Sequence, residues 1–109
     1  MYRVAITGIG IVSCLGNDPQ TVGVALRTGA SGVIVDDQRT ELGFRSPLTG
    51  QIRNFDASIL SRKQRKSMPD FAVWAYSSAR DALAMAELAD IDIRNDQTGL
   101  LYGCDSSCI

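Results

Sequence analysis

Histidine is missing from this sequence of 109 residues. Histidine is the side chain that most often serves as a general base near neutral pH, and it is the commonest metal ligand. Its absence excludes any Ser-His or Cys-His nucleophile pair within the chain. The three cysteines alone are too few to form a zinc site. We therefore predict that the chain contains no catalytic residue and binds neither a metal nor a cofactor.

The sequence also lacks a strong charge of either sign and any apolar run long enough to cross a bilayer, since its formal net charge is −1. A balanced charge gives no bulk attraction to nucleic acid or to an anionic membrane. Residues 3–14 could be mistaken for a secretion signal, but they hold one basic residue and two interrupting glycines. The odd cysteine count without a C-x-x-C motif fits reduced thiols. We predict a cytoplasmic protein that binds neither nucleic acid nor membrane.

An almost unbroken apolar run, rich in β-branched side chains, fills residues 4–12. This pattern predicts a strand buried on both faces, as in the middle of an α/β sheet. Gly8 and Gly10 mark the place where the strand gives way to a loop, because glycine allows a positive φ or the close approach of another segment. A second buried strand is predicted over residues 98–103.

The two glycines also raise the alternative of dinucleotide binding, since a G-x-G-x-x-G loop after a strand holds a pyrophosphate at a helix N-terminus. Here Ser13 stands at the third glycine position, and the next helix starts several residues too late to point at a phosphate. No acidic residue ends a second strand about twenty residues further on. A structural loop is therefore favoured, and a small nucleotide-binding α/β domain stays as the alternative.

Two helices are predicted from capping residues and periodicity. The first spans residues 19–28, begins after a cap at Asn17 or Asp18, and ends at Gly29. The second spans residues 67–88 and begins with a capping box in its first four residues. Its small and apolar side chains form one stripe, and more apolar residues lie off that stripe. This distribution indicates a helix that is contacted on more than one side.

The middle of the chain is less regular. Residues 33–35 predict a short edge strand, and residues 42–52 predict an extended excursion with turns. Asp56 is expected to cap a short helix that ends in the basic run at residues 62–66. This run holds both lysines of the chain and four of its 11 basic residues. It is either a solvated helix end, where cations favour the helix dipole, or a docking patch for an acidic partner.

Two cysteines, Cys104 and Cys108, follow the second predicted strand. Neither has a lysine or arginine close in sequence that could lower the pKa of its thiol, so we interpret both as loop thiols. Two buried strands and a helix contacted on several sides also need more sheet than these residues provide, because an isolated strand pair is marginal in water. We therefore expect an incomplete sheet, in a chain that forms the opening of a larger domain.

Three segments together resemble the β-ketoacyl-acyl-carrier-protein synthases, the condensing enzymes of the thiolase-like family. They are VAITGIGIVSCLGND at residues 4–18, RKQRKSMPDFAVWAYSSARDAL at residues 62–83 and TGLLYGCDSS at residues 98–107. Their order and spacing match that family over essentially the whole chain. The resemblance implies an α/β fold in which residues 1–109 form the N-terminal part of a thiolase-like α-β-α-β-α layered domain, within a homodimer.

The resemblance also implies a reaction. These enzymes elongate an acyl chain by decarboxylative Claisen condensation with a malonyl-carrier protein, in fatty acid or polyketide synthesis. A cysteine nucleophile and two histidines perform it, and all three lie further along in the family than this chain reaches. We therefore expect the chain to be inactive alone. A non-catalytic partner subunit of the chain-length-determining kind is the alternative parent.

The resemblance implies two sites in this chain. The first is a docking surface for the acidic acyl carrier protein, formed by Arg62, Lys63 and Lys66, and it implies no such role for Arg65. The second is a loop that lines the acyl pocket or the dimer interface, formed by Asp105, Ser106 and Ser107.

Overall fold

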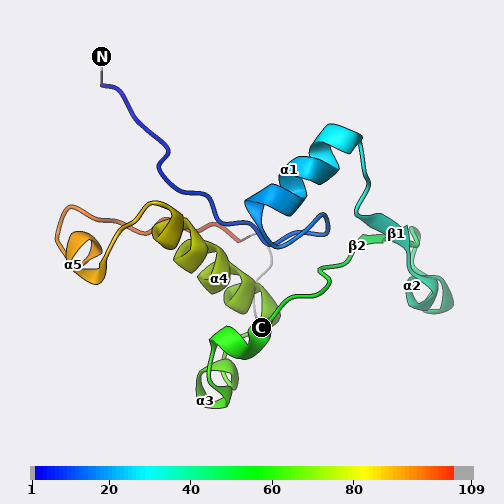
Figure 1. Cartoon of the computed structure of the whole chain (residues 1–109). Helices are drawn as coiled ribbons and strands as arrows, with labels where there is room; N and C mark the ends of the chain where they lie inside the picture. The colour runs from blue at the N-terminus through cyan, green and yellow to red at the C-terminus, as the bar shows by residue number, and fades with distance from the viewer. Residues whose placement is uncertain (1, 105–109) are drawn as a thin grey trace.

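The computed structural model describes residues 2–104 of the chain, and Figure 1 shows their arrangement. Helices dominate, and the sheet found among these residues has two strands. The elements in chain order are α1 (Pro19–Thr28), β1 (Val33–Val35), α2 (Asp37–Glu41), β2 (Leu48–Gly50), the 3₁₀ helix η1 (Ala57–Ile59), α3 (Arg62–Arg65), α4 (Asp70–Met85) and α5 (Asp90–Ile93).

Helix α1 forms as its capping residues predict. The carboxylate of Asp18 accepts hydrogen bonds from the backbone N–H of Thr21 at 2.8 Å and from the Thr21 hydroxyl at 2.7 Å. Pro19 occupies the first turn, and Gly29 ends the helix in the left-handed region with a φ of 68°. Of the two caps that the sequence allows, the structure selects Asp18.

The segment after α1 folds into a small lobe that contains β1, α2 and β2 (Figure 1). The predicted edge strand is confirmed as β1, which pairs antiparallel with β2 so that Ile34 lies opposite Thr49. Strand β2 lies within the stretch predicted as an extended excursion. Helix α2 was not expected, because its five residues carry no apolar periodicity. It forms after a local cap, in which the Asp36 carboxylate accepts from the N–H of Gln38 at 3.0 Å.

The prediction of one short helix from Asp56 into the basic run is wrong. Asp56 does cap η1, but the backbone at Leu60 is extended and Ser61 then caps a separate helix, α3. Ser61 and Gln64 form a reciprocal capping box, in which Gln64 Oε1 accepts from the Ser61 N–H at 3.0 Å. The basic residues therefore make up α3 and its end, and are not the last turn of a longer helix.

Helix α4 is confirmed, but the capping box predicted at Ser67 and Asp70 is wrong. Pro69 is the N-cap residue, and no side chain caps this helix. Proline disfavours helical backbone in the residue before it, so the helix cannot begin before Pro69. The helix ends at Met85, three residues earlier than predicted, and Glu87 then adopts a positive φ of 57°.

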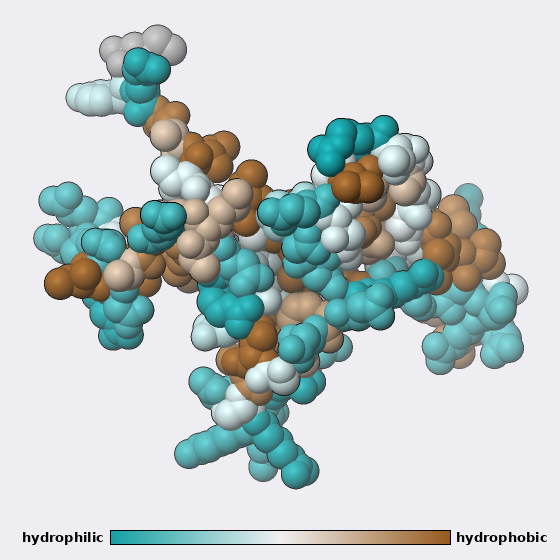
Figure 2. Space-filling view, in the orientation of Figure 1, coloured by the Kyte–Doolittle hydropathy of each residue, from teal (hydrophilic) through white to brown (hydrophobic). Residues whose placement is uncertain are grey.

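The two buried strands predicted from apolar runs are not formed in the described residues. Val4 and Leu101 are 93% and 98% exposed, and neither run belongs to the β1–β2 sheet. The physical reason is that a strand needs a neighbour for its backbone groups, and no other strand among residues 2–104 lies beside either run. Figure 2 shows the resulting apolar surface on the N-terminal segment and on the β1–β2 lobe.

The buried core is correspondingly small. The buried side chains are Val22, Leu60, Val73 and Ser77. The radius of gyration is 17.0 Å, whereas a compact domain of this length has a value of about 13 Å. The described residues therefore form an open arrangement around α4, with mixed α/β content. None of the helices within residues 2–104 has the length and apolar character needed to span a membrane.

Gly8 and Gly10 lie directly against α4. A Cβ atom at Gly8 would collide with the backbone carbonyl of Ala82, and one at Gly10 would collide with that of Ser78. The predicted close approach of another segment is thus confirmed, and the approaching segment is the small-residue face of α4. Since Val73 and Ser77 are buried elsewhere on the same helix, α4 is contacted on more than one side as predicted.

Candidate functional site

The candidate site is built on α3 and its C-cap residue Lys66, which together carry four cationic residues on little more than one helical turn. Side chains three and four positions apart lie on the same face of a helix. Arg62 and Lys66 have this spacing and share one face, and Lys63 and Arg65 flank them on either side, since Lys63 is three positions from Lys66 and Arg65 is three positions from Arg62. The sequence prediction chose Arg62, Lys63 and Lys66, and the structure places all three on α3 or at its C-cap.

A surface hollow of about 810 Å³ lies beside this face of α3. We call it the basic hollow. Its lining comes from η1, from α3 and from the start of α4, and consists of Ala57, Ser58, Leu60, Arg62, Arg65, Lys66, Met68 and Asp70. Lys63 does not line it. The lining includes buried Leu60 as well as the three cations, so the hollow combines apolar and cationic surface.

The four cations of α3 are available to a partner. All are exposed, and the ion pairs found within residues 2–104 join other residues, namely Arg80 with Asp81 and Arg94 with Asp90. Asp70 is the acidic residue that lines the basic hollow, against three cations. A concentration of positive charge that is not neutralised by its own fold attracts an acidic partner.

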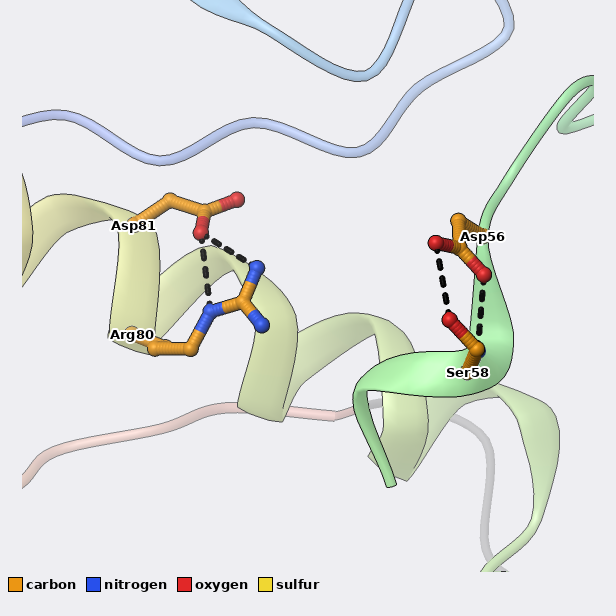
Figure 3. Close-up of polar contacts among 4 residues, drawn as sticks. All are labelled: Asp56, Ser58, Arg80 and Asp81. Atoms are coloured by element: carbon orange, nitrogen blue, oxygen red, sulfur yellow. Dashed lines mark hydrogen bonds and ion pairs between the residues drawn. The ribbon is translucent and has the colours of Figure 1, made fainter. Parts of the chain in front are cut away.

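The wall formed by η1 is held by local hydrogen bonds. The Asp56 carboxylate accepts from the Ser58 N–H at 2.8 Å and from the Ser58 hydroxyl at 2.9 Å (Figure 3). These bonds, the backbone one above all, hold the pKa of Asp56 below its ordinary value, and the positive charge of Arg80 adds a smaller lowering. Figure 3 shows Arg80 on α4 bonded to Asp81 instead.

A second, smaller pocket of about 390 Å³ lies at the start of α1. Its polar lining includes Asn17, whose Nδ2 donates to the carbonyl of Arg53 at 2.7 Å, and whose Oδ1 is buried without a hydrogen-bond partner. Cys14 also lines it, but this thiol packs against Gly32, where a Cβ atom would lie 2.7 Å from the sulfur. We assign Cys14 a packing role, because its side chain also lies against Gly50.

The second predicted site is the loop that lines the acyl pocket or the dimer interface. Asp105, Ser106 and Ser107 lie outside the described residues, as does Cys108. Cys104 is described and exposed. Within residues 2–104, no cluster of three or more acidic or cysteine side chains is arranged to hold a metal ion.

Sequence reasoning missed Arg65, although the signal was present. Arg65 stands three positions after Arg62, so the two share a face of α3, and both line the basic hollow. The glycine loop at residues 8–10 has no site character in the structure, since α4 occupies the space in front of both glycines.

Comparison with known proteins gives the family. Residues 1–107 match the family described as "Beta-ketoacyl synthase, N-terminal domain". The 3-oxoacyl-[acyl-carrier-protein] synthase 1 of Haemophilus influenzae is 38% identical over 103 residues, which are 94% of this chain and 25% of that protein. The synthase 1 of Escherichia coli K12 is 35% identical, over 94% of this chain and 26% of that protein.

A synthase 2 matches over a similar share of the chain. The 3-oxoacyl-[acyl-carrier-protein] synthase 2 of Coxiella burnetii is 37% identical over 93% of this chain and 25% of its own length. The chain thus spans about a quarter of the length of these relatives. The resemblance stated from the sequence is confirmed, and the chain belongs to the β-ketoacyl synthase family, whose N-terminal domain it matches.

Proposed function

We propose that this chain is the N-terminal part of a 3-oxoacyl-[acyl-carrier-protein] synthase that elongates an acyl chain in fatty acid or polyketide synthesis. The observation that carries the proposal is the match of residues 1–107 to the synthase N-terminal domain. In this reaction the malonyl group loses carbon dioxide, and its α-carbon then forms a bond to the carbonyl carbon of the acyl group. It needs a thiolate nucleophile and oriented donors for the developing oxyanion.

In this proposal the chain helps to bind the acyl carrier protein and supplies none of the catalytic residues. The sequence holds no histidine, and in this proposal the nucleophile and both histidines belong to other residues of the synthase. The chain alone is inactive. Asp105, Ser106 and Ser107 border the acyl chain or the dimer interface, and the whole protein is a cytoplasmic homodimer or pairs with a related synthase subunit.

The docking surface for the acyl carrier protein is formed by Arg62, Lys63 and Lys66. Long cationic side chains that are not neutralised by their own fold raise the rate of encounter with an acidic protein. Their place on α3 supports this role, because the helix is exposed and is held by its own capping box. Docking there would bring the carrier's acyl group toward the synthase.

The test is condensation by the intact protein. Acyl-loaded and malonyl-loaded carrier proteins are supplied together, and the 3-oxoacyl product and carbon dioxide are measured. We expect both products, and we expect Lys63→Glu and Lys66→Glu together to lower kcat/KM by about tenfold or more with little change in kcat at saturating carrier. Binding of the carrier without condensation would contradict the enzymatic proposal and identify a non-catalytic partner subunit.

A further inference from the structure

The N-terminal segment, residues 2–12, runs along α4 and touches it at three consecutive residues (Figure 1). The backbone at Gly8 and Gly10 lies so close to α4 that neither position has room for a Cβ atom. Between them, the Ile9 N–H donates a hydrogen bond to the thioether sulfur of Met85 at 3.4 Å. Among the described residues, this is the hydrogen bond that joins the segment to α4. The sulfur of Met85 therefore helps to hold the segment in place.

The Met85 side chain is also accessible. It is 54% exposed and belongs to the last residue of α4. Met68, the other methionine among residues 2–104, is less exposed and lines the basic hollow. Peroxides commonly convert methionine to its sulfoxide, which turns a flexible apolar side chain into a polar one. Of the two methionines, Met85 is the one that such an oxidant reaches more easily.

We propose that Met85 is an oxidation site, and that its conversion to the sulfoxide by a hydroperoxide loosens the N-terminal segment on α4. In this reaction the sulfur attacks a peroxide oxygen, the O–O bond breaks and an S=O bond forms. The sulfur loses two electrons, and the proton of the attacked oxygen passes to the leaving oxygen, which departs as water or an alcohol. Met85 lies at the opposite end of α4 from the basic hollow, so the site is separate from the proposed docking surface.

The added oxygen weakens the contact on whichever side of the sulfur it stands. If it points toward Ile9, it lies between two atoms that are 3.4 Å apart, so the segment must move outward to keep a normal hydrogen-bond distance. If it points away, it withdraws electron density from a sulfur that is already a weak acceptor. The segment has no room to move closer to α4 in compensation, because Gly8 and Gly10 are already in contact with the helix backbone.

The experiment exposes the intact protein to hydrogen peroxide. Peptide mass mapping measures the uptake of one oxygen atom at each methionine, and hydrogen exchange by mass spectrometry follows the peptide that covers residues 2–12. Met85→Leu removes the sulfur at similar side-chain volume, and Met68→Leu is the matched control. The two methionine sulfoxide reductases, one for each sulfoxide epimer, then test reversal, because peroxide also oxidises thiols and these enzymes restore methionine.

We expect Met85 to be oxidised about fivefold faster than Met68, since its side chain is the more exposed of the two. Oxidation should speed amide exchange in residues 2–12 by about threefold or more, and the reductases should restore the original rate. Met68→Leu should respond to peroxide as the parent does. In Met85→Leu, peroxide should leave the exchange of this peptide unchanged.

Three results would overturn the proposal. Oxidation of Met68 while Met85 stays reduced would show that the Met85 sulfur is not accessible. Unchanged exchange of residues 2–12 in the sulfoxide form would show that the Met85 contact does not hold the segment. An equal response in Met85→Leu and in the parent would assign the effect to another group. If Met85→Leu does not fold, the oxidised parent before and after reductase treatment makes the same comparison.

Discussion

Helix α1 and the N-terminal segment at residues 2–12 are both apolar, yet only one of them forms regular structure. Within α1 the backbone N–H groups beyond the first turn bond to carbonyls four residues earlier, and the Asp18 carboxylate caps the first turn by accepting from the Thr21 N–H. The N-terminal segment needs a neighbouring strand for its backbone groups, and the described residues offer none. Local partners were sufficient for the helix, and the strand depended on distant ones.

The N-terminal segment nevertheless has a definite place, which it owes to α4. Gly8 and Gly10 lie on the backbone of that helix, and the Ile9 N–H reaches the sulfur of Met85 at 3.4 Å. The difference between the two regions is therefore one of kind. Helix α1 is fixed by hydrogen bonds within itself, and the N-terminal segment is fixed by steric fit at two glycines.

The largest effect is expected from adding a single methyl group where the N-terminal segment lies against α4. Gly10→Ala places a Cβ atom inside the carbonyl of Ser78, so the segment must move off α4, and we expect a loss of about 2 kcal/mol or more in the free energy of unfolding. Urea unfolding of the intact protein measures it. Gly99→Ala is the matched control, because a Cβ atom there meets nothing within 4 Å, and its effect should stay within about 0.5 kcal/mol. Equal losses in the two variants would show that the steric fit is unimportant.

A smaller effect tests the local side of the comparison. Ser61→Ala removes the cap of α3, which should cost about 1 kcal/mol and speed amide hydrogen exchange at Gln64 about fivefold. Ser67→Ala is the control, because Ser67 was the cap predicted from sequence and the structure gives it no capping bond. Faster exchange at Asp70 and its neighbours in Ser67→Ala would instead restore the sequence prediction.

The smallest effect is the pH dependence of the α1 cap. Hydrogen bonds from the Thr21 N–H and hydroxyl hold the pKa of Asp18 below its ordinary value of 3.8. The folded pKa lies below the unfolded one, so the stabilisation is complete above the unfolded pKa and is lost as pH falls through the folded pKa. Acid titration of α1 helicity from about pH 5 to about pH 2 measures this loss. Asp18→Asn should flatten the titration, and an unchanged curve would show that another group controls it.

These contrasts also explain what the sequence could predict. The caps of α1, the strand β1 and the body of α4 follow from residues that interact with near neighbours, so local patterns are sufficient to find them. The start of α4 was misplaced because Ser67 and Asp70 have the spacing of a capping box. The helix instead begins after Pro69, which restricts the backbone of the residue before it. The strands predicted around Val4 and Leu101 depended on partners that a local pattern does not contain.

The candidate site was predicted in composition but not in geometry. The concentration of charge at residues 62–66 was visible, and the family resemblance gave it a purpose. The basic hollow is lined by residues of η1, α3 and the start of α4 together, and a local sequence pattern does not show how these three elements meet.

The contact of the N-terminal segment with α4 has a consequence for the order of folding. Ile9 and Met85 are 76 residues apart, so this contact closes one of the longest loops in the chain. Such a loop carries a larger entropic cost than the turns within α1 or the β1–β2 lobe, and its partner surface exists only once α4 is helical. During synthesis, the residues that leave the ribosome first therefore reach their final place only after α4 has been made.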